Sequence, residues 1–281
     1  MSKTIFLCAI SNTSSGSCSE NCKFCTQSAT NNADIEKYKY KDISVIVDEA
    51  KQASENGATG FCLVTAGKGL DDKKVAFISR AARAVKSELK DINLIACNGT
   101  ATLAQLQELK KSGVDSYNHN LETAESFYPN LCTTHTWQER FQTCLNVKEA
   151  GLNLVTGGIF GLGESEEDRV SFIASLKKLN PKTVPINFFH PNPALPLKAE
   201  PLSIDKALEL VKWVREELPE VKLMAAGGRE ITFKGRQSEI FEAGVNAIVI
   251  GNYLTTPGAA PDQDRTMIES LGHTVASTCN G

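Results

Sequence analysis

The chain has 281 residues, of which 41% are hydrophobic and 22% are charged, and its formal net charge at pH 7 is -3. This length allows one large α/β domain or two small ones. The slightly negative charge provides no basic surface, so we expect no nucleic-acid partner. The N-terminal apolar run is too short for a signal peptide or a membrane helix, and we therefore expect a cytoplasmic protein that contacts no membrane.

Apolar runs alternate with amphipathic segments along the whole sequence, and this alternation predicts the fold. The apolar runs predict strands over residues 5–10, 59–65, 92–97, 114–121, 152–157, 183–189, 221–226 and 247–252. The amphipathic segments predict helices over residues 43–56, 72–89, 102–112, 137–150, 164–179, 203–218, 232–243 and 262–271. Strict alternation favours one (β/α)8 TIM-type barrel domain over residues 1–281, with a tail from about 257 to 281 that closes or extends it. A doubly wound open sheet is the alternative.

Three cysteines follow the first predicted strand in the spacing C-x3-C-x2-C, at Cys18, Cys22 and Cys25. Nine cysteines in a reducing compartment favour metal binding or catalysis over a disulfide framework. Thiolate groups of this kind suit zinc or an iron–sulfur cluster. A structural zinc site needs four ligands, so three local cysteines leave one metal position open. A zinc knuckle that takes a distant fourth ligand is the alternative.

Cys62 and Cys97 lie inside the second and third predicted strands, and Cys8 lies inside the first. A single buried cysteine is usually a small hydrophobic residue. Neighbouring strands change this expectation, because the inward residues of a barrel converge on one axis. If all three side chains point inward, they can hold a second cluster below the first.

Polar residues alternate along the fourth predicted strand at Asn118, Asn120 and Glu122, so they share one face. Asn187 in the sixth strand adds another amide. Amides both donate and accept hydrogen bonds, which suits a neutral ligand with N–H and C=O groups. These asparagines can equally tie down loops. Arg140, on a predicted helix, is on its own as well explained by a surface ion pair.

The cysteine spacing resembles the radical S-adenosylmethionine (SAM) enzymes, and the longer pattern resembles the biotin synthase family over nearly the whole chain. The most specific string is Tyr117-Asn118-His119-Asn120-Leu121-Glu122. The other segments that carry the resemblance are SGSCSENCKFCTQS, GFCLV, LIACNGTATL, TTHTWQERFQT, GLNLVTGGIFGLGE, TVPINFF, AAGGRE and YLTTPG. The resemblance implies insertion of sulfur into dethiobiotin to form biotin, by a 5′-deoxyadenosyl radical and with an auxiliary iron–sulfur cluster as sulfur donor. No catalytic side chain is expected, because the cofactors carry the chemistry.

The resemblance also implies roles for individual residues. Cys18, Cys22 and Cys25 match the ligands of a [4Fe-4S] cluster whose open iron binds SAM. Cys62 and Cys97 match ligands of the auxiliary cluster. The implied SAM contacts are Asn120, Glu122, Arg140 and Thr65, and the implied dethiobiotin contacts are Asn118, Asn120 and Asn187.

Two positions depart from the family pattern. Val155 stands where the family has a cysteine ligand, and Met224 stands where it has an arginine ligand. Neither is a credible ligand for a [2Fe-2S] cluster. We therefore expect a different auxiliary centre, held by Cys62, Cys97 and tentatively Cys8, with a fourth ligand from Cys279 or inorganic sulfide. Cys132 and Cys144 are expected to have no role at the site.

The resemblance further implies a flavodoxin or ferredoxin as electron donor and a homodimer. A second enzyme hypothesis is another radical SAM barrel, of the hydrogenase maturase or methylornithine synthase type. A non-enzyme hypothesis is an iron–sulfur scaffold or carrier. The scaffold hypothesis predicts no SAM binding and no need for Asn118, Asn120 or Arg140.

Overall fold

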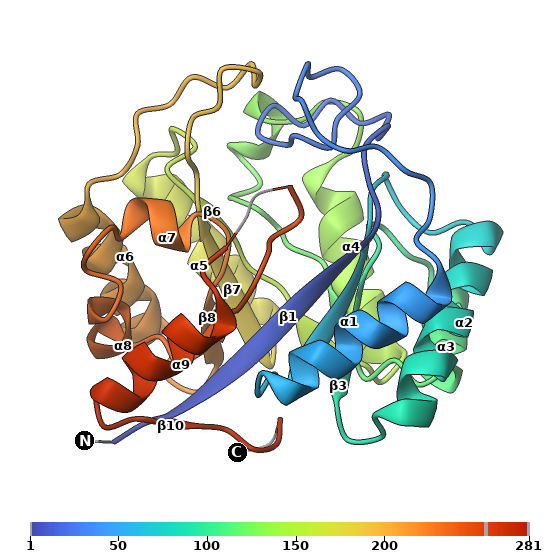
Figure 1. Cartoon of the computed structure of the whole chain (residues 1–281). Helices are drawn as coiled ribbons and strands as arrows, with labels where there is room; N and C mark the ends of the chain where they lie inside the picture. Colours follow the sequence, from blue (N-terminus) through green and yellow to red (C-terminus); the bar gives the residue numbers. More distant parts are fainter. Residues whose placement is uncertain (1, 256–257, 280–281) are drawn as a thin grey trace.

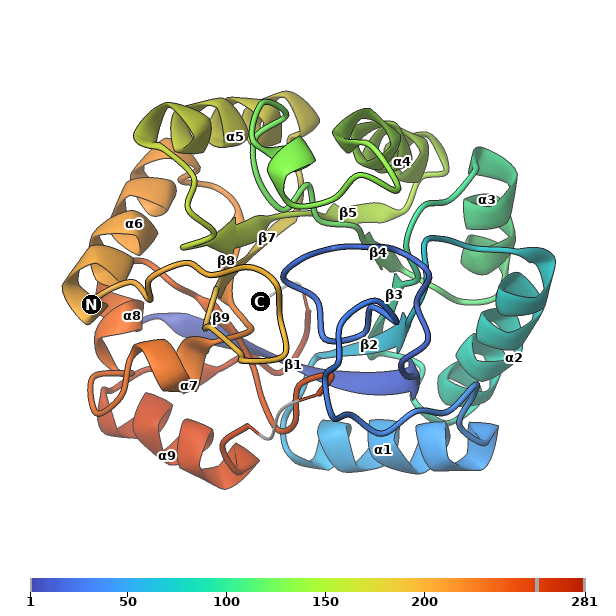
Figure 2. The same cartoon turned by 90° about the horizontal axis from the view of Figure 1, so that it is seen from above.

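The computed structural model, which describes residues 2–255 and 258–279, contains a closed parallel barrel (Figures 1 and 2). Neighbouring strands pair in chain order, and the last barrel strand pairs with the first, which closes the barrel. The barrel strands are β1 (Thr4–Ser14), β2 (Gly60–Thr65), β3 (Asn93–Cys97), β4 (Ser116–Asn118), β5 (Asn153–Val155), β7 (Thr183–Phe188), β8 (Lys222–Ala225) and β9 (Ala247–Val249). The (β/α)8 prediction is confirmed, and the open-sheet alternative is wrong.

Helices form a ring around the barrel, as the view along its axis shows (Figure 2). Reciprocal capping boxes begin three of them, at Thr102, Thr136 and Ser165, and fix where each helix starts. The larger helices are α1 (Ile43–Glu55), α2 (Asp72–Glu88), α3 (Leu103–Lys111), α4 (Trp137–Glu149), α5 (Glu166–Leu179), α6 (Ile204–Glu217) and α9 (Pro261–Ser270). A 3-10 helix, η1 (Tyr128–Asn130), precedes α4.

Two short strands were not expected from the sequence. The predicted strand 152–157 stops at Val155, and β6 (Gly158–Phe160) then pairs separately with β7. The break passes through Gly157, where a side chain would overlap the carbonyl oxygen of Pro185, so only glycine fits. A last strand, β10 (Thr274–Val275), pairs with the start of β1.

The predicted helix over residues 232–243 is wrong. The structure has two short helices there, α7 (Arg229–Thr232) and α8 (Glu239–Ala243). Between them lies Gly235, whose φ of 68° is left-handed and ends helical geometry. The amphipathic pattern therefore came from two separate segments that bury Ile240, Phe241 and Phe233 against the same core.

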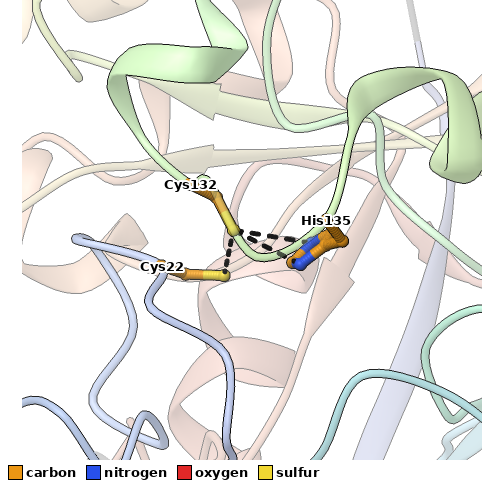
Figure 3. Close-up of side chains that lie close together, drawn as sticks. All are labelled: Cys22, Cys132 and His135. Carbon is orange, nitrogen blue, oxygen red and sulfur yellow. Dashed lines mark hydrogen bonds between the residues drawn. The ribbon is translucent and has the colours of Figure 1, made fainter.

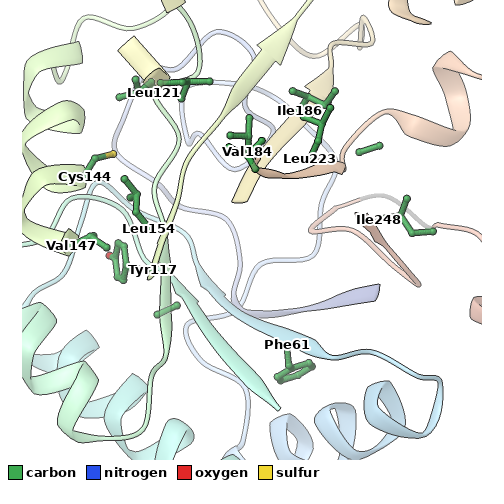
Figure 4. Close-up of a cluster of buried hydrophobic side chains, with 14 of the residues drawn as sticks. Phe61, Tyr117, Leu121, Cys144, Val147, Leu154, Val184, Ile186, Leu223 and Ile248 are labelled. Atoms are coloured by element: carbon green, nitrogen blue, oxygen red, sulfur yellow. The ribbon is translucent and has the colours of Figure 1, made fainter. Parts of the chain in front are cut away.

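The strands bury both of their faces, one toward the helices and one toward the barrel axis. In β2, Phe61 and Leu63 belong to the core between barrel and helices, whereas Cys62 and Val64 belong to the core inside the barrel. Figure 4 shows part of the outer core, including Phe61, Tyr117 and Leu154. Two buried faces explain why the strands read as continuous apolar runs.

The described part of the C-terminal segment lies at the N-terminal end of the barrel. Pairing of β10 with β1 brings the chain beneath the strands, and Lys222 at the start of β8 donates to the Cys279 carbonyl oxygen at 2.8 Å. The Cys279 side chain then lines the barrel cavity. Part of the tail expected to close the barrel, residues 257, 280 and 281, lies outside the described residues. Across the described ranges, no helix is both long and apolar enough to cross a membrane.

A buried ion pair fastens α9 to α7. Arg229 has 0% exposure, and its guanidinium donates to both carboxylate oxygens of Asp264 at 2.9 and 2.8 Å. We expect Arg229→Ala to lower the free energy of unfolding by about 3–5 kcal/mol, because it leaves a buried carboxylate without its partner. Denaturant unfolding of the whole chain measures this. Arg236→Ala is the control, since Arg236 forms exposed pairs with Asp205 and Glu239. Equal effects of the two variants would contradict the prediction.

Candidate functional site

The three-cysteine loop begins where β1 ends, on the face of the barrel formed by the carboxyl ends of the strands (Figure 1). The chain leaves β1 through Gly16 and Ser17, both with left-handed φ angles of 73° and 57°. A left-handed non-glycine residue is uncommon and indicates that the surrounding contacts fix the turn. The loop therefore has a defined shape at the place where barrel enzymes position their functional groups.

Backbone hydrogen bonds hold the three cysteines in this loop. The Cys18 N–H donates to Gln27 O at 3.1 Å, and its carbonyl accepts from the Ala29 N–H at 2.7 Å. The Asn31 side-chain amide donates to the carbonyl oxygens of Cys22 and Cys25, at 3.1 and 2.8 Å. The backbone of all three cysteines is thus fixed by hydrogen bonds.

The thiols of Cys18, Cys22 and Cys25 are not gathered closely enough in this structure to share one metal ion. Among the described residues, their sulfurs do not form a group with all members within 4.8 Å of one another. Burial raises the pKa of Cys25 to about 11 and also raises the pKa of Cys18. Loading of iron must therefore release protons from these thiols. The zinc-knuckle alternative gains no support from the described residues, since no group of possible metal ligands there contains all three cysteines.

An ion pair lies beside the loop. Arg140, on α4, donates from Nη2 to Glu122 Oε1 at 3.0 Å and from Nε to the Asn120 carbonyl oxygen at 2.6 Å. Both side chains are nearly buried, at 13% and 11% exposure. Burial raises the pKa of Glu122, and Arg140 opposes this shift. A buried carboxylate and a guanidinium fork suit ribose hydroxyls and an amino-acid carboxylate, which are the groups that SAM presents.

Asn118, Asn120, Glu122 and Asn187 all line a cavity of about 380 Å³ inside the barrel. The shared face was predicted, but β4 ends at Asn118, so a loop and not a strand carries Asn120 and Glu122. The side-chain carbonyl oxygen of Asn118 is buried and has no hydrogen-bond partner among the described residues. An unpaired buried acceptor is costly, and it marks a place where a ligand N–H can bind.

Asn187 and Thr65 are already engaged within the protein. Asn187 donates to Gly158 O at 3.1 Å and accepts from the Gly227 N–H at 2.8 Å, so it ties β7 to neighbouring segments. The Thr65 hydroxyl accepts from the Asn98 amide at 3.1 Å. Thr65 lies at the end of β2 and is absent from the described cavity lining.

Cys8, Cys62 and Cys97 point into the same cavity from three adjacent strands. The register pairs Cys8 with Gly60, two residues before Cys62, and Cys62 with Ile95, two residues before Cys97. The three side chains therefore share one parity. The neighbouring Cys97 thiol and burial both raise the pKa of Cys62, and burial raises the pKa of Cys8 to about 12.

The cavity also contains the two positions that depart from the family pattern. Val155 and Met224 both line it, and neither offers a thiolate or a guanidinium. Cys279 enters from the barrel floor, with its sulfur 3.6 Å from the Lys222 ammonium. The barrel interior thus brings together four cysteines, at positions 8, 62, 97 and 279.

The sequence pattern gave no sign of Cys132 and His135 at the site. Both lie in the segment before α4, and the Cys132 sulfur is 3.6 Å from the Cys22 sulfur (Figure 3). His135 Nδ1 is 2.6 Å from Glu20, which lies between the first two cysteines of the loop. The expectation that Cys132 has no role at the site therefore has to be reconsidered. Cys144, in contrast, packs in the outer core.

Comparison with known families agrees with this site. The family model described as Radical SAM superfamily matches residues 12–176, which include the loop, Glu122 and Arg140. A model described as Biotin and Thiamin Synthesis associated domain matches residues 185–274. The barrel, the three-cysteine loop and the first match define the chain as a member of the radical SAM superfamily, whose members bind a [4Fe-4S] cluster and SAM.

Curated relatives show which family within the radical SAM superfamily the chain resembles. A biotin synthase from a Sulfurovum species is 58% identical over 99% of this chain and 98% of the relative. Biotin synthases from a Nitratiruptor species and from Wolinella succinogenes are 57% and 55% identical, over 98% and 99% of this chain and 99% and 100% of the relatives. The chain belongs to the biotin synthase family.

Solved structures with the same fold are more distant in sequence. The FeFe-hydrogenase maturase HydG from Carboxydothermus hydrogenoformans superposes with a TM-score of 0.84 at 20% identity, over 97% of this chain and 68% of that chain. Methylornithine synthase (PylB) gives 0.82 at 17% identity, over 97% of this chain and 84% of that chain. These likenesses support the barrel fold.

Proposed function

We propose that this chain converts dethiobiotin to biotin by inserting one sulfur atom. The observation that carries the proposal is the barrel itself, with a three-cysteine loop at its open face and a second group of cysteines inside. When bound, the [4Fe-4S] cluster and SAM supply a radical that removes hydrogen atoms from unactivated carbons. The protein's part is to place the substrate between the loop and the inner cysteines and to exclude water.

Cys18, Cys22 and Cys25 would hold the [4Fe-4S] cluster. Glu122 and Arg140 would bind the ribose and methionyl parts of SAM, with Asn120 and the Thr65 backbone beside them. Asn118 would accept a hydrogen bond from the ureido ring of dethiobiotin, because its side-chain carbonyl oxygen is buried and unpaired among the described residues. Asn187 and Asn120 would line the same ring, although Asn187 also fastens β7.

The auxiliary cluster would be held by Cys8, Cys62 and Cys97, with Cys279 or an inorganic sulfide as the remaining ligand. Support comes from the shared cavity of these cysteines and from Val155 and Met224, which cannot complete a [2Fe-2S] site. A larger cluster that carries an added sulfide would be a ready sulfur donor. We further propose a cytoplasmic homodimer that receives electrons from a flavodoxin or ferredoxin, as the family resemblance implies.

The test is a single-turnover assay. The chain is reconstituted anaerobically with iron and sulfide, reduced, and given SAM and dethiobiotin, and biotin is measured by mass spectrometry. Biotin formation with matching 5′-deoxyadenosine supports the proposal. Cleavage of SAM without biotin would indicate another radical SAM reaction, and no cleavage would indicate a scaffold or carrier.

Asn118→Ala should raise the KM for dethiobiotin about tenfold, equivalent to about 1.4 kcal/mol, which is the upper end for one neutral hydrogen bond. Slow SAM cleavage in the absence of dethiobiotin should not change, because that step does not use Asn118. The measurement is biotin formed against dethiobiotin concentration. Asn153→Ala, an exposed asparagine at the start of β5, is the control. An unchanged KM in Asn118→Ala would remove Asn118 from the substrate site.

A further inference from the structure

The segment from Leu131 to His135 forms a wall against the three-cysteine loop. The Lys23 N–H donates to Leu131 O at 2.9 Å, and Asn21 Oδ1 accepts from the Thr133 N–H at 2.9 Å. Behind these contacts lie Cys132 and His135, with 3% and 5% exposure. Two buried side chains that can bind metal or move protons thus lie directly beside a candidate cluster ligand (Figure 3).

These side chains do not form a metal site of their own, although Cys22, Cys132 and His135 lie within 4.8 Å of one another. Both imidazole nitrogens of His135 are already in use. Nε2 is 2.7 Å from the Tyr128 hydroxyl and 3.1 Å from Arg140 Nη1, and a guanidinium can only donate. Nε2 must therefore accept, and the partners assign the proton to Nδ1, which donates to Glu20 at 2.6 Å.

The Cys132 and Cys22 sulfurs lie 3.6 Å apart, within hydrogen-bond distance, and the Cys132 side chain is buried. Iron binds a cysteine as the thiolate, which can only accept a hydrogen bond, whereas a thiol can donate one. With Cys22 as a cluster ligand, Cys132 is therefore the donor of an S–H hydrogen bond to the sulfur of Cys22. Hydrogen bonds to the sulfurs are among the factors that set the potential of an iron–sulfur cluster.

His135 joins the loop to the ion pair of the cofactor pocket. On one side it donates to Glu20 of the loop, and on the other it accepts from Arg140, which binds Glu122 at 3.0 Å. All four side chains in this chain of contacts are nearly buried. These contacts connect the loop directly to the two side chains proposed to hold SAM.

We propose that Cys132 and His135 are positioning residues of the SAM-binding cluster: Cys132 raises the potential of the cluster through a hydrogen bond to Cys22, and His135 fixes Arg140 for SAM binding. The inference rests on the proposed function, because it requires a cluster on Cys22. The inference assigns the cluster potential to Cys132 and the SAM affinity to His135, so each role has its own measurement.

The first experiment measures the cluster potential by anaerobic redox titration of the reconstituted chain, followed by electron paramagnetic resonance. The signal that changes on addition of SAM identifies the relevant cluster. In Cys132→Ala, the ratio of reduced to oxidised cluster at a fixed potential should fall about tenfold, a shift of about 59 mV to lower potential. Cys144→Ala removes an equally buried thiol from the outer core and should leave the potential unchanged.

The second experiment measures SAM affinity from the same spectral change. In His135→Ala the dissociation constant should rise about 10-fold, which is the size of effect expected when one hydrogen bond that orients a binding group is lost. The cluster potential without SAM should change less than in Cys132→Ala, because the Cys132–Cys22 contact remains although the 3.3 Å contact of His135 Nδ1 with the Cys132 sulfur is lost. His135→Gln keeps one donor and one acceptor and should recover part of the affinity.

The outcomes separate the inference from the proposed function. A wild-type chain that binds no cluster at the loop would contradict the proposed function. A loaded Cys132→Ala with unchanged potential, or a loaded His135→Ala with unchanged SAM affinity, would contradict the inference alone. If Cys132→Ala takes up no iron at the loop, Cys132→Ser is measured instead, because serine keeps a hydrogen-bond donor. A wild-type cluster potential in Cys132→Ser supports the donor role of Cys132. Loss of the cluster in Cys132→Ser overturns that role.

Discussion

Replacing Cys25 with alanine should remove one cluster and abolish SAM cleavage. We expect the iron content of the reconstituted chain to fall from about eight to about four per chain, because a [4Fe-4S] cluster on three thiolates does not persist on two. The reason lies in the loop, whose backbone is fixed by Gln27, Ala29 and Asn31 and offers no substitute thiol in the right place. Iron and sulfide analysis, with 5′-deoxyadenosine as the readout of cleavage, measures both effects.

Two variants make this result specific. Cys144→Ala lacks a buried thiol in the outer core and should keep all iron and full cleavage. Cys132→Ala should also keep its iron, because Cys132 is proposed to donate to Cys22 and not to bind iron. SAM cleavage that survives in Cys25→Ala would show that the radical chemistry uses another site.

The second large effect concerns the barrel interior. Cys62→Ala/Cys97→Ala should also lose about four irons, yet it should still cleave SAM while forming no biotin, because it lacks the sulfur donor. Mössbauer spectra show which of the two clusters has lost its iron. The physical reason is that the two thiols share one cavity with Cys8 and are remote in sequence from the loop. Val155→Ala changes the same cavity wall without removing a thiol and should keep the iron.

The iron count of the unmodified chain tests the composition of this cluster. About eight irons support two cubane-type clusters, whereas about six would indicate an ordinary [2Fe-2S] centre and contradict the argument from Val155 and Met224. About four irons, unchanged by the double substitution, would remove the sulfur donor and the proposed sulfur insertion together.

Much of the fold and part of the site could be predicted because barrels are regular. The parity of a strand determines which side chains point inward, and Cys8, Cys62 and Cys97 meet the condition of a shared inward face that the sequence left open. The position of a loop after β1 placed Cys18, Cys22 and Cys25 at the open end. The predicted bounds of strands and helices were wrong where a glycine interrupts the periodic pattern, at Gly157 between β5 and β6 and at Gly235 between α7 and α8.

The contacts around His135 could not be predicted from local pattern. Glu20 and His135 are 115 residues apart, and Cys22 and Cys132 are 110 residues apart. Their meeting depends on how the loop after β1 and the segment before α4 fold over the barrel end, which no periodicity describes. The pairing of Arg140 with Glu122 was missed for the same reason, although each residue was expected at the cofactor.

Lys222 gives the barrel interior a local counter-charge. Its ammonium lies 3.5 Å from the centre of the Phe6 ring and 3.6 Å from the Cys279 sulfur, and its positive charge lowers the pKa of Cys8 against the effect of burial. Thiolates in an apolar cavity are costly unless a cation lies near them. Met224, two residues further along β8, leaves its position without the arginine charge of the family pattern. Lys222 at the floor of the barrel thus supplies a positive charge that Met224 does not, and Lys222→Met would make the Cys8 thiolate harder to form.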